Sequence, residues 1–152
     1  MANTFLENNV ISLGKTLVAD GTAEVLTAVV DMSGYDELTF VILHGDVDAA
    51  AVMTYTVKEN TASSTSSPTP TTVTGTIVTG TGATISSGAL TITESGGQLD
   101  NKLLAITVGH SSLSKRYVFL SITCTVESHE INGIIAIQSR PKAMPVSQSS
   151  DV

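Results

Sequence analysis

Hydrophobic and polar residues alternate along most of the chain in short runs, which is the pattern of β-strands with one buried face. The clearest runs cover residues 38–43, 53–58, 103–108, 118–126 and 131–138. Polar segments rich in Gly, Asp, Asn and Ser separate these runs roughly every ten residues, a spacing typical of sandwiches and barrels. No helical period extends over a helix-length window. The pattern predicts one all-β domain, a β-sandwich or jelly-roll-like barrel.

Some runs support more specific predictions. In residues 38–43 both sides of the predicted strand are apolar, which favours a central strand covered on both faces. Residues 103–108, 118–126 and 131–138 follow one another closely and predict three neighbouring strands in the middle of a sheet. Residues 23–32 predict a strand, and a short helix is the alternative because Ala, Glu and Leu are present.

The alternation in residues 118–126 also predicts which side chains are buried. One side of this strand is expected in the core, against the strands at 104–106 and 131–137, and it carries Val118, Leu120, Ile122 and Cys124. The chain has a single cysteine, so an internal disulfide cannot form. The apolar neighbours of Cys124 predict a buried small hydrophobic side chain rather than a reactive thiol.

The two ends and one internal loop differ from the strand pattern. The predicted domain covers residues 14–140, with an extended N-terminal arm at 1–13 and a C-terminal tail at 141–152, where proline leaves the sheet. The arm either docks on a partner or is a frayed terminus. The candidate partner-binding residues are the apolar positions of the arm and tail: Phe5, Leu6, Val10, Ile11, Leu13, Met144 and Val146. Residues 60–72 are rich in Ser, Thr and Pro and predict an exposed, mobile loop.

The overall charge limits the classes of partner. The formal net charge is −7, and charged residues make up only 14% of the chain. Phosphate backbones and anionic membranes repel such a chain, so we expect neither nucleic acid nor a membrane as the main partner. The N-terminal residues have no basic stretch followed by an apolar one, and no apolar run reaches membrane-helix length. We therefore expect a soluble protein made in a cytoplasm.

The residue types that usually carry chemistry are present but not grouped. His44, His110 and His129 lack metal-ligand spacing, and we expect them to be solvated or locally hydrogen-bonded. Residues 45–48 predict a hairpin turn, although Asp46 and Asp48 leave a weak surface cation site as the alternative. The only basic pair, at 115–116, predicts the start of a strand, and binding to an acidic partner is the alternative. The sequence therefore predicts neither an enzyme nor a bound cofactor.

Several segments, in this order, resemble small virion proteins of tailed bacteriophages, and in particular capsid decoration (cement) proteins. The resemblance covers residues 30–142 and rests on VDMSGYD at 30–36, KENTA at 58–62, DNKLL at 100–104, KRYV at 115–118 and INGIIAIQ at 131–138. It implies a β-sandwich or jelly-roll-like subunit, usually a homo-trimer, that binds the major capsid protein on the outer capsid surface and stabilises the shell. The expected location is the virion, after synthesis in the host cytoplasm.

Two other functions remain open. One is another virion component, such as a tail or head-completion protein. The other is a glycan-binding or receptor-binding β-sandwich, for which a chain with 4% aromatic residues and no Trp is a poor candidate. A hydrolase is disfavoured because no nucleophile, base and orienting group occur in a recognisable arrangement.

Overall fold

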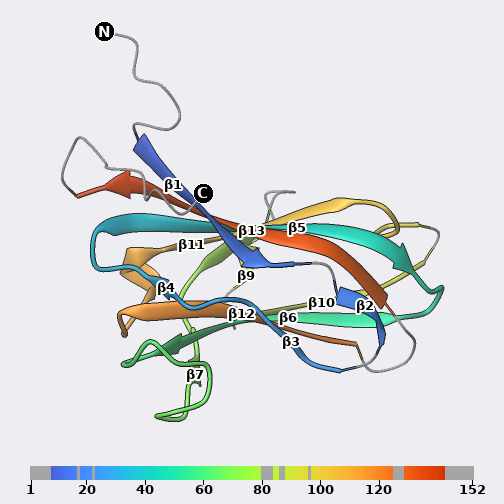
Figure 1. The fold of residues 1–152 in the computed structure, drawn as a ribbon, viewed down its shortest axis with the longest axis horizontal. Coiled ribbons are helices and arrows are strands. Elements are labelled where there is room, and N and C mark those ends of the chain that lie inside the picture. Colours follow the sequence, from blue (N-terminus) through green and yellow to red (C-terminus); the bar gives the residue numbers. More distant parts are fainter. Residues whose placement is uncertain are drawn as a thin grey trace, which may run out of the picture.

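The protein is a β-sandwich of two open antiparallel sheets packed face to face (Figure 1). The computed structural model describes residues 8–16, 18–21, 23–79, 84–85, 88–95, 97–124 and 129–142, with the backbone alone at 19–21 and 84–85. The all-β prediction is confirmed. The described strands do not close into a barrel, so of the two predicted architectures the sandwich is the correct one.

The larger sheet, called sheet A here, has seven strands in the order β1-β13-β5-β11-β8-β9, and β2 also pairs with β13. Its strands are β1 (Asn9–Lys15), β2 (Val18–Gly21), β5 (Tyr35–Val47), β8 (Ile77–Thr79), β9 (Thr84–Ile85), β11 (Leu103–Gly109) and β13 (His129–Pro141). The two longest strands, β5 and β13, lie side by side at its centre.

The smaller sheet, called sheet B here, has six strands in the order β10-β6-β12-β3, with β4 paired to β12 and β7 to β6. Its strands are β3 (Val25–Leu26), β4 (Val30–Asp31), β6 (Val52–Asn60), β7 (Thr71–Thr72), β10 (Ala89–Thr93) and β12 (Tyr117–Cys124). The one helical element among the described residues is the short 3-10 turn η1 (His110–Ser112). No helix in the described part of the chain is long and apolar enough to cross a membrane.

The core lies between the two sheets and is filled from both sides. Sheet A contributes Phe40 and Ile42 from β5, and sheet B contributes Tyr55 from β6; each is 1% exposed or less. Val118, Leu120, Ile122 and Cys124 of β12 are also buried, which confirms the predicted core face. Phe119 is buried as well, although it lies on the opposite side of β12. Burial of this kind stabilises a sheet by about 25 cal/mol for each Å² of apolar surface removed from water.

The prediction of three neighbouring C-terminal strands is wrong. The strands β11 and β13 lie on either side of β5 in sheet A, but β12 belongs to sheet B, where it pairs with β6. The connection through η1 carries the chain from one sheet to the other. Strands that follow one another in sequence are often neighbours, yet both sheets need apolar strands, so the alternation alone does not indicate the sheet.

Residues 23–32 form neither one strand nor a helix. They form the short strands β3 and β4, interrupted at Thr27 and Ala28. The N–H of Thr27 donates to the carbonyl of Leu120 in sheet B, and the N–H of Ala28 donates to the carbonyl of Gly14 in sheet A. The interruption therefore places one backbone segment across the gap between the two sheets.

Strand β5 extends through the segment predicted to turn at residues 45–48. It continues to Val47, and the turn follows, where the N–H of Ala51 donates to the carbonyl of Asp48 and Ala50 has φ +71°. Asp46 and Asp48 both lie exposed at this end of the sheet. The turn is displaced because β13 continues to pair with β5 as far as Val47.

The predicted arm is shorter than expected within the described residues. Residues 9–13 belong to β1, which pairs with β13 from Asn9↔Ser139 to Leu13↔Ile135 at the edge of sheet A. The apolar side chains of Ile11 and Leu13 alternate with polar or small residues, as expected for a strand at the edge of a sheet. Residues 1–7 and 143–152 lie outside the described residues. At the C-terminal side, β13 ends at Pro141, close to the predicted boundary.

The Ser- and Thr-rich loop after β6 is mostly exposed, as predicted, but it does not lack an anchor. Asn60 is fully buried, and its amide donates to the carbonyls of Ser64 (2.8 Å) and Pro68 (2.9 Å) and accepts from the N–H of Thr61 (2.7 Å). The hydroxyl of Ser64 accepts from the N–H groups of Ser66 and Ser67. Polar contacts rather than apolar ones thus anchor this loop.

We expect Leu120→Ala to lower the free energy of unfolding by about 2–5 kcal/mol, because it empties a fully buried core position. Thr123→Ala, three residues along the same strand and half-buried on its other face, should cost less than about 1 kcal/mol. Urea unfolding followed by circular dichroism measures both. Equal losses would contradict the assignment of faces in β12.

We expect Asn60→Ala to cost about 2–3 kcal/mol, since it removes three hydrogen bonds from a buried position. Ser66→Ala in the same loop is the matched control, because that side chain is exposed. The same urea titration tests both variants, and limited proteolysis shows whether the loop opens. An Asn60 variant as stable as the control would exclude the anchoring role.

Candidate interaction surface

The described residues show no arrangement typical of a catalytic or metal centre. No three or more His, Cys, Asp or Glu side chains of the described residues are grouped closely enough to hold a metal ion. Cys124 is buried with 4% exposure, and His110 lies in the turn η1, half-buried. The basic pair lies directly before β12, where Arg116 pairs with Asp31 and Lys115 donates to the hydroxyl of Thr71.

Two histidines occupy the interior at one end of the sandwich. His44 is fully buried and His129 is 1% exposed, so the expectation that they are solvated is wrong for both. The Nε2 atom of His44 lies 3.0 Å from the hydroxyl oxygen of Tyr55, and the two rings meet edge to face at 79°. Because His44 belongs to β5 and Tyr55 to β6, this hydrogen bond joins the two sheets inside the core.

Burial keeps this pair uncharged. Desolvation, with a smaller contribution from the nearby His129, lowers the pKa of His44 from 6.5 to about 4, although Glu94 acts in the opposite direction. Burial likewise raises the pKa of the Tyr55 phenol far above its ordinary value. A neutral imidazole and a neutral phenol can share a hydrogen bond without the cost of a buried charge. The pair is thus a polar contact that suits a structural role.

Glu94 orders the loop beside this end of the core. It is 3% exposed, and its carboxylate accepts from the N–H groups of Gly97 (2.6 Å), Gln98 (2.8 Å) and Leu99 (2.6 Å). Burial by itself would raise the pKa of Glu94, but these N–H donors outweigh it and the pKa lies below the ordinary value. The carboxylate therefore acts as a loop cap.

The most prominent candidate surface is the outer side of sheet A, called the apolar face here. Inward side chains of β5 such as Phe40 and Ile42 are buried in the core, so the residues between them point outward. The apolar side chains that share this outer side across five strands are Ile11, Leu13, Val41, Leu43, Val78, Leu103, Ala105, Ile135 and Ile137. All five large hydrophobic side chains that are exposed in the described residues belong to it.

The strand register arranges the apolar face in rows that cross the sheet. One row contains Gly133, Leu43 and Leu103, the next contains Leu13, Ile135, Val41 and Ala105, and a third contains Ile11, Ile137, Thr39, Thr107 and Val78. Exposure reaches 68% at Leu103 and 62% at Leu13. Thr39 and Thr107 share a hydrogen bond of 2.9 Å within the third row, so even the polar members are satisfied by each other.

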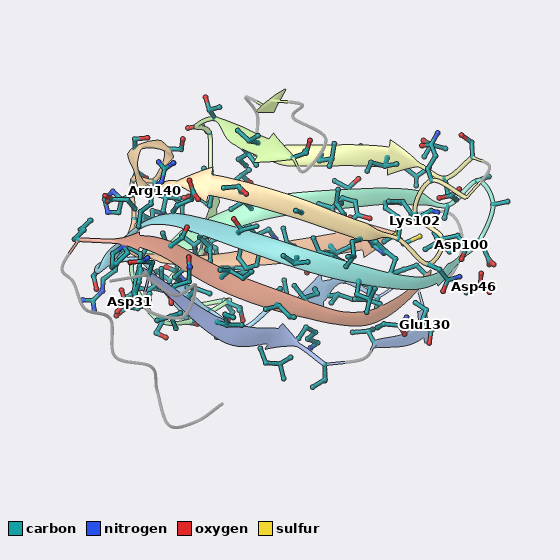
Figure 2. All side chains as sticks on the ribbon, turned by 90° about the horizontal axis from the view of Figure 1, so that it is seen from above. Asp31, Asp46, Asp100, Lys102, Glu130 and Arg140 are labelled. Carbon is teal, nitrogen blue, oxygen red and sulfur yellow. The ribbon has the colours of Figure 1, made fainter. Side chains whose placement is uncertain are left out.

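Charged side chains lie at the two ends of sheet A rather than in these rows (Figure 2). Asp46, Asp100, Glu130 and Lys102 gather at one end, called the acidic end here. Arg140 lies at the opposite end, where it approaches Glu37 at 3.6 Å, and Lys142 approaches Asp36 at 3.8 Å. This second end is called the mixed end here. The rows between the two ends contain no ionisable side chain.

The candidate partner-binding residues divide into three groups. Ile11 and Leu13 lie on the apolar face, whereas Val10 lies opposite Gln138 on the inward side of β1 and is half-buried. Leu13 also lines a groove of about 460 Å³ beside β1, together with residues 28–31 and Tyr35. Phe5, Leu6, Met144 and Val146 lie outside the described residues.

Sequence reasoning missed the larger part of the apolar face. The strand at 38–43 was expected to be covered on both sides, but Leu43 is 43% exposed and no described element covers the outer side of β5. The signal was the double-sided apolar pattern itself, which was assigned to burial within one chain. The same pattern fits a strand whose second face is covered by another molecule.

We expect the buried histidine to make stability pH-dependent. Because the pKa of His44 is lower in the folded state (about 4) than its ordinary 6.5, the unfolded chain binds more protons between these values. Stability should be full above pH 6.5 and fall as the pH is lowered, by about 2–3 kcal/mol at pH 4.5 on the scale of 1.36 kcal/mol per pKa unit.

Urea unfolding at pH 7.5, 6.0 and 4.5 measures this dependence. In His44→Gln the loss between pH 6.5 and 4.5 should shrink, whereas His110→Gln, which changes a half-buried histidine in a turn, should keep the dependence of the unchanged protein. An unaltered slope in His44→Gln would assign the acid sensitivity to other groups.

Comparison with known proteins does not identify this chain. No protein-family model matches it, and no curated protein matches it either.

Proposed function

We propose that this chain is a non-enzymatic structural subunit of a phage virion, which decorates the outer surface of the capsid and stabilises the shell. The apolar face is the observation that favours a subunit of a larger assembly, and the capsid as the setting rests on the resemblance and on the apolar residues of the chain ends. Five strands that each occupy about 4.8 Å give it a width of about 24 Å, and the five residues from Thr39 to Leu43 at about 3.4 Å each give it a length of about 17 Å. The largest contiguous apolar patch on a monomeric protein is about 300–600 Å² and is often functional, so a patch of this size marks a candidate interaction site.

Two further features support an assembled particle as the setting. The loop after β6 lies on the side of the molecule away from sheet A, so it stays free when the apolar face is covered (Figure 1). The net charge of −7 disfavours contact with packaged nucleic acid and suits an outer position. The resemblance to capsid decoration proteins points to the same setting and adds a homo-trimer as the expected assembly.

Attachment to the major capsid protein is assigned to the N-terminal segment and the tail. Phe5 and Leu6 precede β1, which lies at the edge of sheet A, and Met144 and Val146 follow β13, the neighbour of β1. Several copies of a weakly binding segment in one oligomer raise the effective concentration and hence the avidity. A ligand that binds only the assembled shell stabilises it by mass action.

Co-sedimentation with undecorated capsids tests the proposal. The full chain should bind and raise the temperature at which the capsids open, whereas the double variant Phe5→Asp, Leu6→Asp should bind at least about tenfold more weakly, a change of 1.4 kcal/mol or more. Asn3→Asp is the matched control, since it adds charge to the same segment without removing an apolar side chain. Point substitutions suit this test better than deletion through Ser12, which would remove most of β1 and its pairing with β13.

Failure of the full chain to bind any capsid would exclude decoration and favour a tail or head-completion role. Binding by the double variant equal to that of the control would move the attachment site away from the N-terminal segment.

A further inference from the structure

We propose that the apolar face packs against the apolar face of a second copy of this chain, with the strands of the two copies antiparallel. The proposal deepens the proposed function, because it names the partner that covers this face. It also stands apart from capsid binding, which is assigned to the chain ends. The contact pairs two copies and leaves further assembly to other surfaces.

The first argument is shape. Sheets that pack face to face lie about 10 Å apart, and side chains of the two faces must interdigitate. On the apolar face, large residues lie in the row of Leu43 and Leu103, while the row of Thr39 and Thr107, two rows away on the same strands, is small at these positions. A two-fold axis that lies between the two copies, parallel to the row of Val41, places the leucine row of one copy over the threonine row of the other. Leucines of one copy then meet threonines of the other.

The same axis gives Gly133 a counterpart. In β13 the large Ile137 occupies the threonine row, and Gly133 occupies the leucine row. The two-fold operation places Ile137 of the second copy over Gly133 of the first. The outer side of Gly133 is open: an added Cβ would meet no atom nearer than the carbonyl oxygen of Lys15 at 3.7 Å. In the two outer rows of the three central strands each large side chain thus meets a small one, while Val41 and Ile135 in the axis row meet their own counterparts.

The second argument is charge, which selects the direction of packing. Shape alone also permits a parallel arrangement, with the axis along β5, but that arrangement stacks the two acidic ends on each other. Asp46, Asp100 and Glu130 of one copy would then lie close to the same carboxylates of the other copy and repel them. The antiparallel arrangement places each acidic end over a mixed end, where Arg140 is 75% exposed and can turn toward it.

The third argument is area. The width and length given above correspond to a footprint of about 400 Å², which is smaller than the roughly 800 Å² per partner of a standard interface. The size suits a pair that forms at high protein concentration or when both copies are held on one particle. A larger apolar partner would find no further apolar surface beyond the charged ends, whereas a second copy has the same length, width and charged borders.

Sedimentation velocity of the full chain over a range of concentrations tests the inference. The unchanged protein should show a concentration-dependent dimer. Leu103→Asp should raise the dimer dissociation constant at least about tenfold. Gly133→Leu, whose Cβ makes only an ordinary van der Waals contact inside the monomer, should do the same. Thr93→Asp, on the outer side of sheet B, is the matched control and should leave the dimer intact. Circular dichroism checks that every variant is folded.

Charge variants test the direction. In the antiparallel pair, Arg140→Glu and Asp46→Lys should each weaken the dimer, and an equal mixture of the two should restore it, because opposite charges then meet. A tighter dimer in Asp46→Lys would overturn the antiparallel arrangement, since it would mean that acidic ends face each other.

A monomer at every concentration, or an oligomer that Leu103→Asp and Gly133→Leu leave unchanged, would overturn the inference. Capsid co-sedimentation is scored separately on the same variants. Capsid binding without a dimer would support the proposed function and contradict this inference. A dimer without capsid binding would support this inference and contradict the proposed function.

Discussion

The antiparallel ladder between β5 and β13 is the interaction on which the rest of the molecule depends. The two strands have 13 residues each and pair from Tyr35↔Pro141 to Val47↔His129. A shift of one residue in this register would exchange the inner and outer sides of β13. It would bring Ile135 into the core and turn Ala136 to the surface. The core and the apolar face are therefore two consequences of the same pairing.

Much of the fold could be predicted from the alternation of apolar and polar residues. The buried side of β12 was predicted correctly because Leu120 and Ile122 alternate with polar neighbours such as Ser121. The sheet to which β12 belongs could not be predicted, since the alternation specifies a face but not a partner strand. The division of residues 23–32 into β3 and β4 was equally hidden, because it depends on hydrogen bonds from Thr27 and Ala28 to strands distant in sequence.

The candidate surface was less accessible to sequence reasoning than the fold. The apolar face consists of residues from five strands, and only their register brings Leu13, Ile135 and Leu103 onto one side of one sheet. The buried position of His44 had a signal, because it continues the alternation of Leu38, Phe40 and Ile42. Histidine is a polar residue, which favours a solvated side chain, whereas its place in the alternation favours the core. The hydrogen bond to Tyr55 satisfies the buried ring and so makes the core position possible. Such a polar contact between sheets also disfavours alternative registers, in which the two groups would be buried apart.

The single cysteine makes the opening of the sandwich measurable by the rate at which its thiol is modified. Cys124 is 4% exposed at the end of β12, so a thiol reagent cannot reach its sulfur while the sandwich stays closed. Modification then proceeds only through transient opening, and its rate reports the population of open molecules without any introduced label. Because the chain has no second thiol, every modified molecule records the same event. The rate of labelling in free and assembled protein would therefore compare how often the sandwich opens in each state.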